Sequence, residues 1–265
     1  MSVRYAANLS ILFTELELTA RPAAARAAGF QAVEFWWPFP TVTPDAGAVT
    51  AFADAIRDAG VQLVGLNFYA DDLAAGHRGV VSWPGREAEF QAGVRAAVRI
   101  AAGLGCRKFN ALYGNRLPDV DPAEQDAVAL RNLRFAADAV AEIGGTVLLE
   151  PVSGAPAYPL TTAAHALAVI DQVDGLGLLA DLYHLSVNGD DVDRVIREHT
   201  DRISHVQIAD APGRHEPGTG SLTLKRWLRA LANRGYSGHV AAEYVPAGTT
   251  AEGLGWLSEF TEEIA

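Results

Sequence analysis

Residues 146–150 read Thr146-Val147-Leu148-Leu149-Glu150, a short apolar run that ends in a carboxylate. Three later apolar runs follow the same pattern and end in Asp181, Gln207 and Glu243. Short apolar runs bounded by glycine, proline or polar residues are typical of parallel strands that are buried on both faces. The repetition therefore predicts a parallel sheet in which four consecutive strands end in an oxygen-bearing side chain.

Similar apolar runs recur along the whole chain and alternate with alanine-rich helical stretches. The predicted strands are residues 5–9, 32–35, 62–67, 108–112, 146–150, 177–181, 203–207 and 239–243. Eight strands with intervening helices favour a closed (β/α)8 barrel, a TIM barrel, with residues 1–265 as a single domain. An open doubly wound sheet usually carries G-x-G-x-x-G after its first strand. Here Ser10-Ile11-Leu12-Phe13 follows instead.

The helices between these strands are marked by capping residues. Helices are predicted over residues 22–28, 45–60, 87–102 and 122–143, and each of the four ends at a glycine or just before one. Asp121 and Pro122 form a typical N-cap and first-turn pair. The remaining helices are expected to start at Thr161 or Thr162, Asp190 or Asp191, Thr223 and Thr250.

Composition narrows the class of protein. The chain has 265 residues, of which 49% are hydrophobic and 20% charged, and its formal net charge is −11. These values are ordinary for a soluble globular protein. The acidic balance and the absence of a run of Lys or Arg argue against nucleic acid as a partner. We therefore expect a small molecule as the partner, and homo-oligomerisation remains open.

The compartment is predicted from what the sequence lacks. Its single cysteine, Cys106, cannot form an internal disulfide and is interpreted as a buried structural thiol. The first ten residues read as a strand and not as a signal peptide. No apolar stretch approaches the ~20 residues of a membrane span. We expect no membrane association, and a cytoplasmic protein is the default.

The strand ends predict a metal site. In a βα barrel, residues at the carboxyl ends of the strands face the active site. Three carboxylates gathered there would repel one another unless a cation were bound between them. Carboxylate and amide oxygens suit Mg²⁺ or Mn²⁺. Glu150, Asp181, Gln207 and Glu243 are therefore candidate metal ligands, although any one of them could instead be a capping or loop residue.

Other residues near the same mouth are candidates for binding substrate. His184 follows Asp181 by three residues and could reach the substrate or the metal, or could simply pack at a helix start. Arg214 and Arg86 could each bind a carboxylate, but a solvated loop and a salt bridge at a helix start are equally good interpretations. Glu34 and Asn67 end the second and third strands and are better suited to hydrogen-bonding support than to metal ligation.

An aromatic loop, Trp36-Trp37-Pro38-Phe39-Pro40, follows the second strand. It could wall the pocket and exclude water, or it could pack against the barrel or another subunit.

At these residues the chain resembles the hydroxypyruvate isomerase family of the xylose isomerase-like barrels. The resemblance runs in order through almost the whole chain. It rests on residues 6–10 with 13–15, 24–30 with 32–35, 84–87, Glu150, Asp181 with His184, 205–209, 214–217, and 243–244 with 252–256. Many members carry histidine where this chain has Asn110. Asn110 would face the substrate, so this difference concerns the substrate more than the fold.

The resemblance implies that Glu150, Asp181, Gln207 and Glu243 hold the metal, and that Glu150 and Glu243 transfer protons. The implied reaction is the isomerisation of hydroxypyruvate to tartronate semialdehyde through an enediolate. Alternatives are an isomerase for 2-oxo-tetronate-type acids and a ketose 3-epimerase. A non-catalytic sugar-acid binder would not need two positioned glutamates. Apurinic DNA cleavage, found on related barrels, is disfavoured by the acidic charge.

Overall fold

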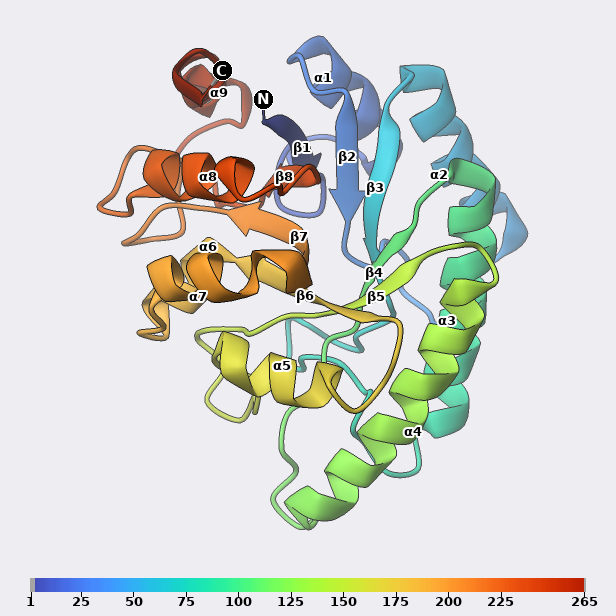
Figure 1. Ribbon diagram of the computed structural model, residues 1–265. Coiled ribbons are helices and arrows are strands. Elements are labelled where there is room, and N and C mark those ends of the chain that lie inside the picture. Colours follow the sequence, from blue (N-terminus) through green and yellow to red (C-terminus); the bar gives the residue numbers. More distant parts are fainter. Residues whose placement is uncertain (1–2, 265) are drawn as a thin grey trace.

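The protein forms a closed barrel of eight parallel strands in chain order (Figure 1). The computed structural model describes residues 3–264. The strands are β1 Arg4–Asn8, β2 Ala32–Phe35, β3 Gln62–Asn67, β4 Lys108–Asn110, β5 Thr146–Leu149, β6 Leu176–Asp181, β7 Ile203–Ile208 and β8 His239–Ala242. Strand β1 pairs with both β2 and β8, which closes the sheet. The predicted fold class is therefore confirmed.

The predicted strands all form. Strands β2 and β3 have the predicted bounds, and the ends of the other six differ by one or two residues. The pairing of β5 stops at Leu149 and that of β8 at Ala242, so Glu150 and Glu243 lie just past their strands. Strand β4 ends at Asn110, two residues earlier than predicted. Strand ends commonly vary by this amount because pairing stops where the backbone bends out toward the loops. The side chains predicted at the mouth remain there.

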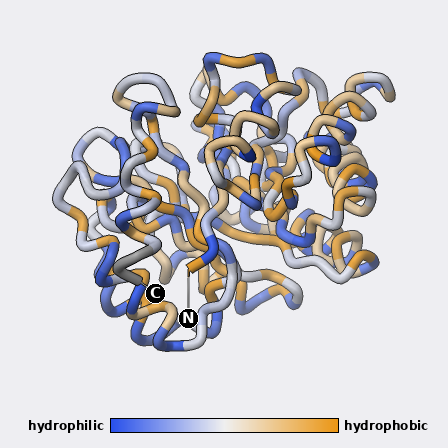
Figure 2. The backbone as a smooth tube through the Cα atoms, turned by 90° about the horizontal axis from the view of Figure 1, so that it is seen from above, coloured by the Kyte–Doolittle hydropathy of each residue, from blue (hydrophilic) through white to orange (hydrophobic). Residues whose placement is uncertain are grey.

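Helices surround the barrel. They are α1 Arg21–Ala27, α2 Ala46–Ala59, α3 Glu87–Leu104, α4 Pro122–Ala141, α5 Ala163–Ile170, α6 Leu182–Val187, α7 Val192–His199, α8 Leu224–Asn233 and α9 Gly255–Ile264, with 3-10 turns at Leu18–Ala20, Thr200–Arg202 and Ala251–Gly253. The long helices α3 and α4 lie side by side on one flank of the barrel (Figure 1). Along the tube, hydrophobic and hydrophilic colours alternate within the helices, as expected for helices with one buried face (Figure 2).

Capping explains several helix starts, and two predictions need correction. Side chains of Asp45, Asp121 and Thr162 cap α2, α4 and α5 as expected. Helix α6 was not predicted as a separate element. It forms directly after β6 because the Asp181 carboxylate accepts from the backbone N–H groups of the next turn. Thr250 starts only a 3-10 turn, because its hydroxyl accepts from Phe13 N–H, and α9 begins at Gly255.

The core has two layers. A small cluster made of Ala6, Ala32, Val64 and Ala241 packs inside the barrel, and a much larger one packs between the strands and the helices. Cys106 belongs to the larger cluster and is fully buried, and burial raises the pKa of its thiol to about 12. The interpretation of Cys106 as a structural thiol is therefore consistent with the structure.

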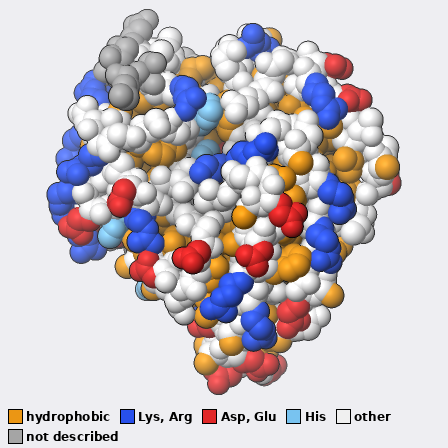
Figure 3. Space-filling view, turned by 45° about the vertical axis from the view of Figure 1, so that its right-hand side comes forward, with side chains coloured by type: hydrophobic (Ala, Val, Ile, Leu, Met, Phe, Trp, Pro, Cys, Tyr) orange, Lys and Arg blue, Asp and Glu red, His pale blue; other side chains and the backbone are white. Residues whose placement is uncertain are grey.

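Two surface properties bear on partners. No helix within residues 3–264 is long and apolar enough to cross a membrane. On the face shown in Figure 3, basic and acidic side chains are interspersed and do not form one large area of either sign.

Candidate active site

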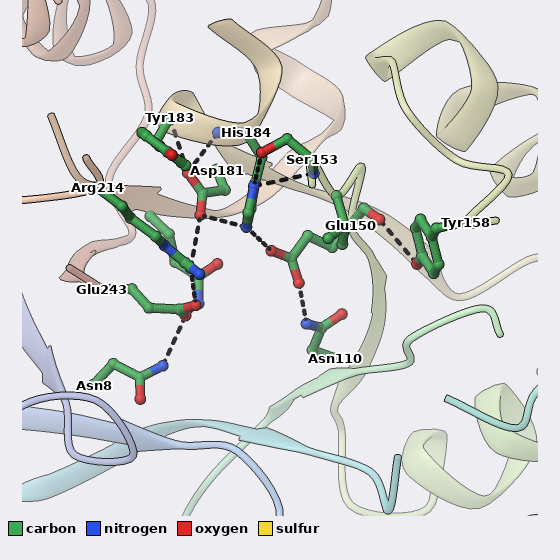
Figure 4. A network of polar contacts seen from close by, with 12 residues as sticks. Asn8, Asn110, Glu150, Ser153, Tyr158, Asp181, Tyr183, His184, Arg214 and Glu243 are labelled. Atoms are coloured by element: carbon green, nitrogen blue, oxygen red, sulfur yellow. Dashed lines mark hydrogen bonds and ion pairs between the residues drawn. The ribbon is translucent and has the colours of Figure 1, made fainter. Parts of the chain in front are cut away.

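Four oxygen-bearing side chains meet at the carboxyl end of the barrel. Glu150 follows β5, Asp181 ends β6, Gln207 lies in β7 and Glu243 follows β8, and all four are buried. Figure 4 shows Glu150 and Glu243 entering from opposite sides, with Asp181 and His184 between them and Arg214 on the side of Glu243. All four side chains therefore lie at the mouth of the barrel, and their joint ligation of one metal stays a prediction.

The Gln207 amide has a fixed orientation. Its Nε2 donates to Glu34 Oε1 at 2.7 Å and also to Glu243 Oε2. Despite its burial, the pKa of Glu34 is held below its usual value, mainly by His205, so Glu34 is an ionised carboxylate that can only accept, and the nitrogen must be the end of the amide that faces it. The Gln207 Oε1 atom is buried without a hydrogen-bond partner, and so is Asp181 Oδ2. Buried oxygens without partners are uncommon, and a bound ion or an ordered water is the usual partner of such atoms.

Glu243 is held by three donors. Asn8 Nδ2 donates to its Oε2 at 2.8 Å, Gln207 donates to the same oxygen, and Arg214 donates to its Oε1. Burial raises the pKa of Glu243 to about 8, because the favourable charge of Arg214 is outweighed by desolvation and by Glu34 and Asp181. Without a cation, this carboxyl group therefore holds a proton more readily than a glutamate in water.

Glu150 has a similar environment on the other side. Asn110 Nδ2 donates to its Oε2 at 2.6 Å, and His184 Nε2 lies 3.8 Å from its Oε1. Desolvation, Glu243 and Asp181 raise the pKa of Glu150 well above its usual value. Two buried carboxyl groups with raised pKa values at the same end of the barrel are typical of a proton-transfer or metal site.

The tautomer of His184 follows from its contacts. The backbone N–H of Ser153 donates to Nδ1 of His184 at 3.1 Å, so Nδ1 is an acceptor. Burial lowers the pKa of His184 to about 4, so the ring is neutral and its proton is on Nε2. That nitrogen faces Asp181 Oδ2 at 3.7 Å. His184 is therefore a hydrogen-bond donor toward the centre of the site.

These contacts bear on which residues could hold a metal. Ligand atoms of Glu150, Asp181 and His184 lie within 4.8 Å of one another, a spacing that suits one divalent ion. Ligation by His184 Nε2 would require Nδ1 to become a donor and would break its bond with Ser153 N–H. The unpartnered oxygens of Asp181 and Gln207 favour an oxygen ligand set instead. The residues present thus fit a hard divalent cation.

Beneath this cluster lies a second set of buried polar side chains. Glu34 accepts from Asn8 Nδ2 at 2.9 Å and from Gln207, and His205 Nε2 donates to its other oxygen at 2.6 Å. Although burial alone raises the pKa of Glu34, His205 and these hydrogen bonds outweigh it and hold the pKa below its usual value. Glu34 was expected to give hydrogen-bonding support, and Asn8 and His205 were missed. Asn8 is the last residue of β1, and this position at a strand end is the sequence feature that could have identified it as a site residue.

A cavity of about 200 Å³ opens over the carboxylates. Glu150 and Glu243 line it, and so does Trp36 from the aromatic loop. The predicted substrate-binding residues His184, Arg214 and Asn67 also line it. The other lining residues are Leu73, Arg78, Leu112, Val152 and Ser153. Arg78 and Ser153 were not predicted, because they lie in loops without a recognisable motif.

Two predicted residues are placed differently from the others. Asn110 is not in the cavity lining, and it contacts the site through Glu150. Arg86 also lies outside the lining, and its guanidinium forms ion pairs with Asp71, at 3.1 Å, and with Glu89. The salt bridge considered from the sequence is therefore what the structure forms, and the structure does not bring Arg86 to the site.

Comparison with known proteins places the chain in a family. It matches the xylose isomerase-like TIM barrel family over residues 22–260. A Streptomyces coelicolor protein with the provisional name hydroxypyruvate isomerase is 52% identical, over 96% of this chain and 95% of that protein. The 2-oxo-tetronate isomerase of Cupriavidus necator is 36% identical, over 97% of this chain and 98% of that protein.

A solved structure agrees closely with the fold. The crystal structure named AP endonuclease, family 2, from Brucella melitensis superposes with a TM-score of 0.90 at 34% identity, and the match covers 98% of this chain and 100% of that one. The names of these relatives differ, but the barrel and the near full-length similarity are shared. The chain belongs to the xylose isomerase-like TIM barrels and, within them, to the hydroxypyruvate isomerase family.

Proposed function

We propose that the protein is a metal-dependent isomerase that moves a carbonyl group between neighbouring carbons of a short hydroxy-oxo acid, with hydroxypyruvate and tartronate semialdehyde as the pair. The observation that carries this proposal is the position of Glu150 and Glu243, two buried carboxyl groups with raised pKa values that face one cavity. Two relatives that match nearly the whole chain are named as isomerases of such acids, which supports the same class of reaction.

The proposed ligand set for the metal is Glu150, Asp181, Gln207 and Glu243, and the proposed ion is Mg²⁺ or Mn²⁺. All four supply oxygen atoms, and two of those atoms have no hydrogen-bond partner. A bound divalent cation would supply Lewis acidity that stabilises negative charge on the substrate oxygens. In this scheme Arg214, which contacts Glu243 and lies 3.7 Å from Asp181, donates to substrate oxygens at the edge of the ligand set.

The proposed proton transfers use the two glutamates. One carboxylate removes a proton from C3 of hydroxypyruvate, and the other delivers a proton to C2, while the hydroxyl proton moves from the oxygen on C3 to the oxygen on C2. The product is tartronate semialdehyde, with no change in atoms or electrons. His184 donates a hydrogen bond from Nε2, and Asn110 holds one oxygen of Glu150 so that the other can accept the proton.

Water must be kept away from the reacting carbons. Trp36, Leu112 and Val152 supply apolar wall to the small cavity, which supports a role in excluding solvent.

A second candidate is an isomerase of four-carbon 2-oxo acids, which the Cupriavidus necator relative favours. A ketose 3-epimerase would use the same carboxylate pair, but the barrels with that name are too dissimilar in sequence to support more than the fold. DNA cleavage is disfavoured, although one similar structure bears an endonuclease name, because the chain carries a net charge of −11 and phosphate contacts dominate DNA affinity.

Solvent exchange tests the proposal. The Mn²⁺-loaded protein would be incubated in D2O with C3 to C6 oxo acids and ketoses, and product and deuterium incorporation would be followed by NMR. We expect tartronate semialdehyde from hydroxypyruvate, with deuterium at C2. Exchange and turnover confined to ketoses would overturn the acid assignment, and no exchange with any compound would overturn the isomerase mechanism.

A further inference from the structure

We infer that Arg78 is the residue that binds the carboxylate group of the substrate. Arg78 lies in the loop after β3, and its half-buried side chain lines the same 200 Å³ cavity as Glu150 and Glu243. The inference rests on the proposed function, since it concerns how this site would select an acid over a neutral sugar. It assigns the role to a residue for which the sequence contains no motif.

The other two arginines considered for this role are already paired. Arg86 forms ion pairs with Asp71 and Glu89 outside the cavity lining. Arg214 contacts Glu243 and Asp181, two of the proposed metal ligands. Within residues 3–264, no carboxylate lies within ion-pair distance of Arg78, whose recorded hydrogen bonds go to backbone carbonyls alone. An anion entering the cavity would therefore find in Arg78 a cation with its charge uncompensated.

The loop holds the Arg78 guanidinium in place. Its Nη1 donates to the carbonyls of Leu73, at 3.1 Å, and His77, at 2.8 Å, and the other guanidinium nitrogens are left for a ligand. The Gly114 N–H donates to the carbonyl of Arg78 at 2.8 Å, which ties this backbone to the segment after β4. A guanidinium held on one side in this way is well suited to a planar carboxylate, because little side-chain freedom remains to be lost on binding.

Charge balance supports the same assignment. With a divalent cation bound, the three carboxylates Glu150, Asp181 and Glu243 would be balanced by the cation and Arg214 together. The charge of Arg78 is then the one positive charge at the cavity that these groups do not balance. It matches the single carboxylate of a short hydroxy-oxo acid. A neutral ketose would leave this charge unpaired in a partly buried place.

The test compares acid binding with neutral binding in matched variants. Arg78→Gln removes the charge, and Arg78→Lys keeps the charge but not the two-pronged geometry. Arg107→Gln is the control, since Arg107 is exposed at the opposite end of the barrel and donates to the carbonyl of Cys106. Calorimetric titration of each Mn²⁺-loaded protein would use D-glycerate, an acid that lacks the carbonyl and cannot be isomerised, with glycerol as the neutral probe.

For Arg78→Gln we expect the Kd for glycerate to rise by about 10- to 100-fold, the loss typical of removing a charged hydrogen-bond partner. The KM for hydroxypyruvate should rise in parallel with a smaller change in kcat. Arg78→Lys should recover part of the affinity, and Arg107→Gln and the wild type should agree. Metal content and thermal midpoint in each variant show that the site and the fold remain intact.

Three results would overturn the inference. The first is an unchanged glycerate Kd in a metal-loaded Arg78→Gln protein. The second is an equal loss in Arg107→Gln, which would indicate a general charge effect. The third is a loss in Arg86→Gln with none in Arg78→Gln, which would return the role to Arg86. Failure of the wild type to isomerise hydroxypyruvate would instead count against the proposed function, and the glycerate titration would still report on Arg78.

Discussion

Gln207 Nε2 donates to Glu34 Oε1 at 2.7 Å, and this contact determines which end of the Gln207 amide faces the carboxylate cluster. The amide oxygen is left without a partner, as expected for a metal ligand. Glu34 itself is held by Asn8 and His205, so the orientation is set from beneath the site. Residues that orient metal ligands in this way usually affect metal affinity although they do not contact the ion.

Replacing Glu34 by Gln should therefore weaken metal binding. The new amide nitrogen would face a donor from Asn8, Gln207 or His205, and the contact that fixes the orientation of the Gln207 amide would be weakened. We expect the Kd for Mn²⁺, measured by electron paramagnetic resonance, to rise by about 10- to 100-fold. Glu124→Gln, on the exposed start of α4, is the matched control. An Mn²⁺ Kd equal to that of the control would show that Glu34 does not orient Gln207.

The roles of His184 and Gln207 can be separated. Because Ser153 N–H fixes His184 as a donor at Nε2, His184→Ala should retain bound metal and lose turnover. Gln207→Ala should lose metal, since it removes one of the two unpartnered oxygens. Metal content and rate would be measured on the same preparations. If His184→Ala lost as much metal as Gln207→Ala, His184 would be a ligand and the assigned tautomer would be incorrect.

Metal affinity should rise with pH. The pKa of Glu243 is raised to about 8 and that of Glu150 is raised well above normal, so near neutral pH a cation must displace protons to bind. We expect the Kd for Mg²⁺ to fall steadily between pH 6 and pH 8.5, with proton release in calorimetry. A Kd that does not change over this interval would mean that both carboxyl groups are already ionised in the metal-free protein.

The same shifts predict how the stability of the metal-free protein varies with pH. A carboxyl group whose pKa is higher in the folded state stabilises the fold fully below its unfolded pKa, and this contribution is lost as pH rises through the folded pKa. For Glu243 the loss runs from about pH 4.5 to about pH 8. The thermal midpoint of the metal-free protein should therefore be lower at pH 8.5 than at pH 6, and saturating Mg²⁺ should reduce the difference. If the thermal midpoints at pH 6 and pH 8.5 differed as much or more with Mg²⁺ bound, the result would contradict this prediction.

Gly79 is expected to be intolerant of substitution. Its φ is +93°, and an added Cβ would lie 1.8 Å from the carbonyl oxygen of Leu112. The Cβ is attached rigidly to the backbone of residue 79, and the Leu112 oxygen is itself a backbone atom. Neither atom can rotate away, so Gly79→Ala must displace the loop that carries Arg78. We expect a loss of about 1–3 kcal/mol in the free energy of unfolding from the left-handed backbone alone, plus weaker glycerate binding. Gly76→Ala, also at positive φ but with open space around it, serves as the comparison.

Much of this architecture was predictable from sequence because it depends on local patterns. The strand ends at Glu150, Asp181, Gln207 and Glu243 follow from apolar runs and barrel geometry alone. What escaped prediction depends on contacts between distant segments. Ser153 is 31 residues from His184, and Glu34 is 173 from Gln207. Arg86 and Arg78 look alike in sequence, and only the folded loop shows which guanidinium is already paired.

The proposed mechanism depends on proton transfer by Glu150 and Glu243, and the rate of hydroxypyruvate turnover in D2O by Glu150→Gln and Glu243→Gln measures the contribution of each. Each substitution keeps the size of the side chain and one ligand oxygen but removes the base. We predict that both variants, with metal content confirmed, lose at least ~100-fold in rate and incorporate deuterium correspondingly more slowly. If either variant binds metal normally and turns over near the wild-type rate, that glutamate does not transfer a proton and the mechanism is wrong.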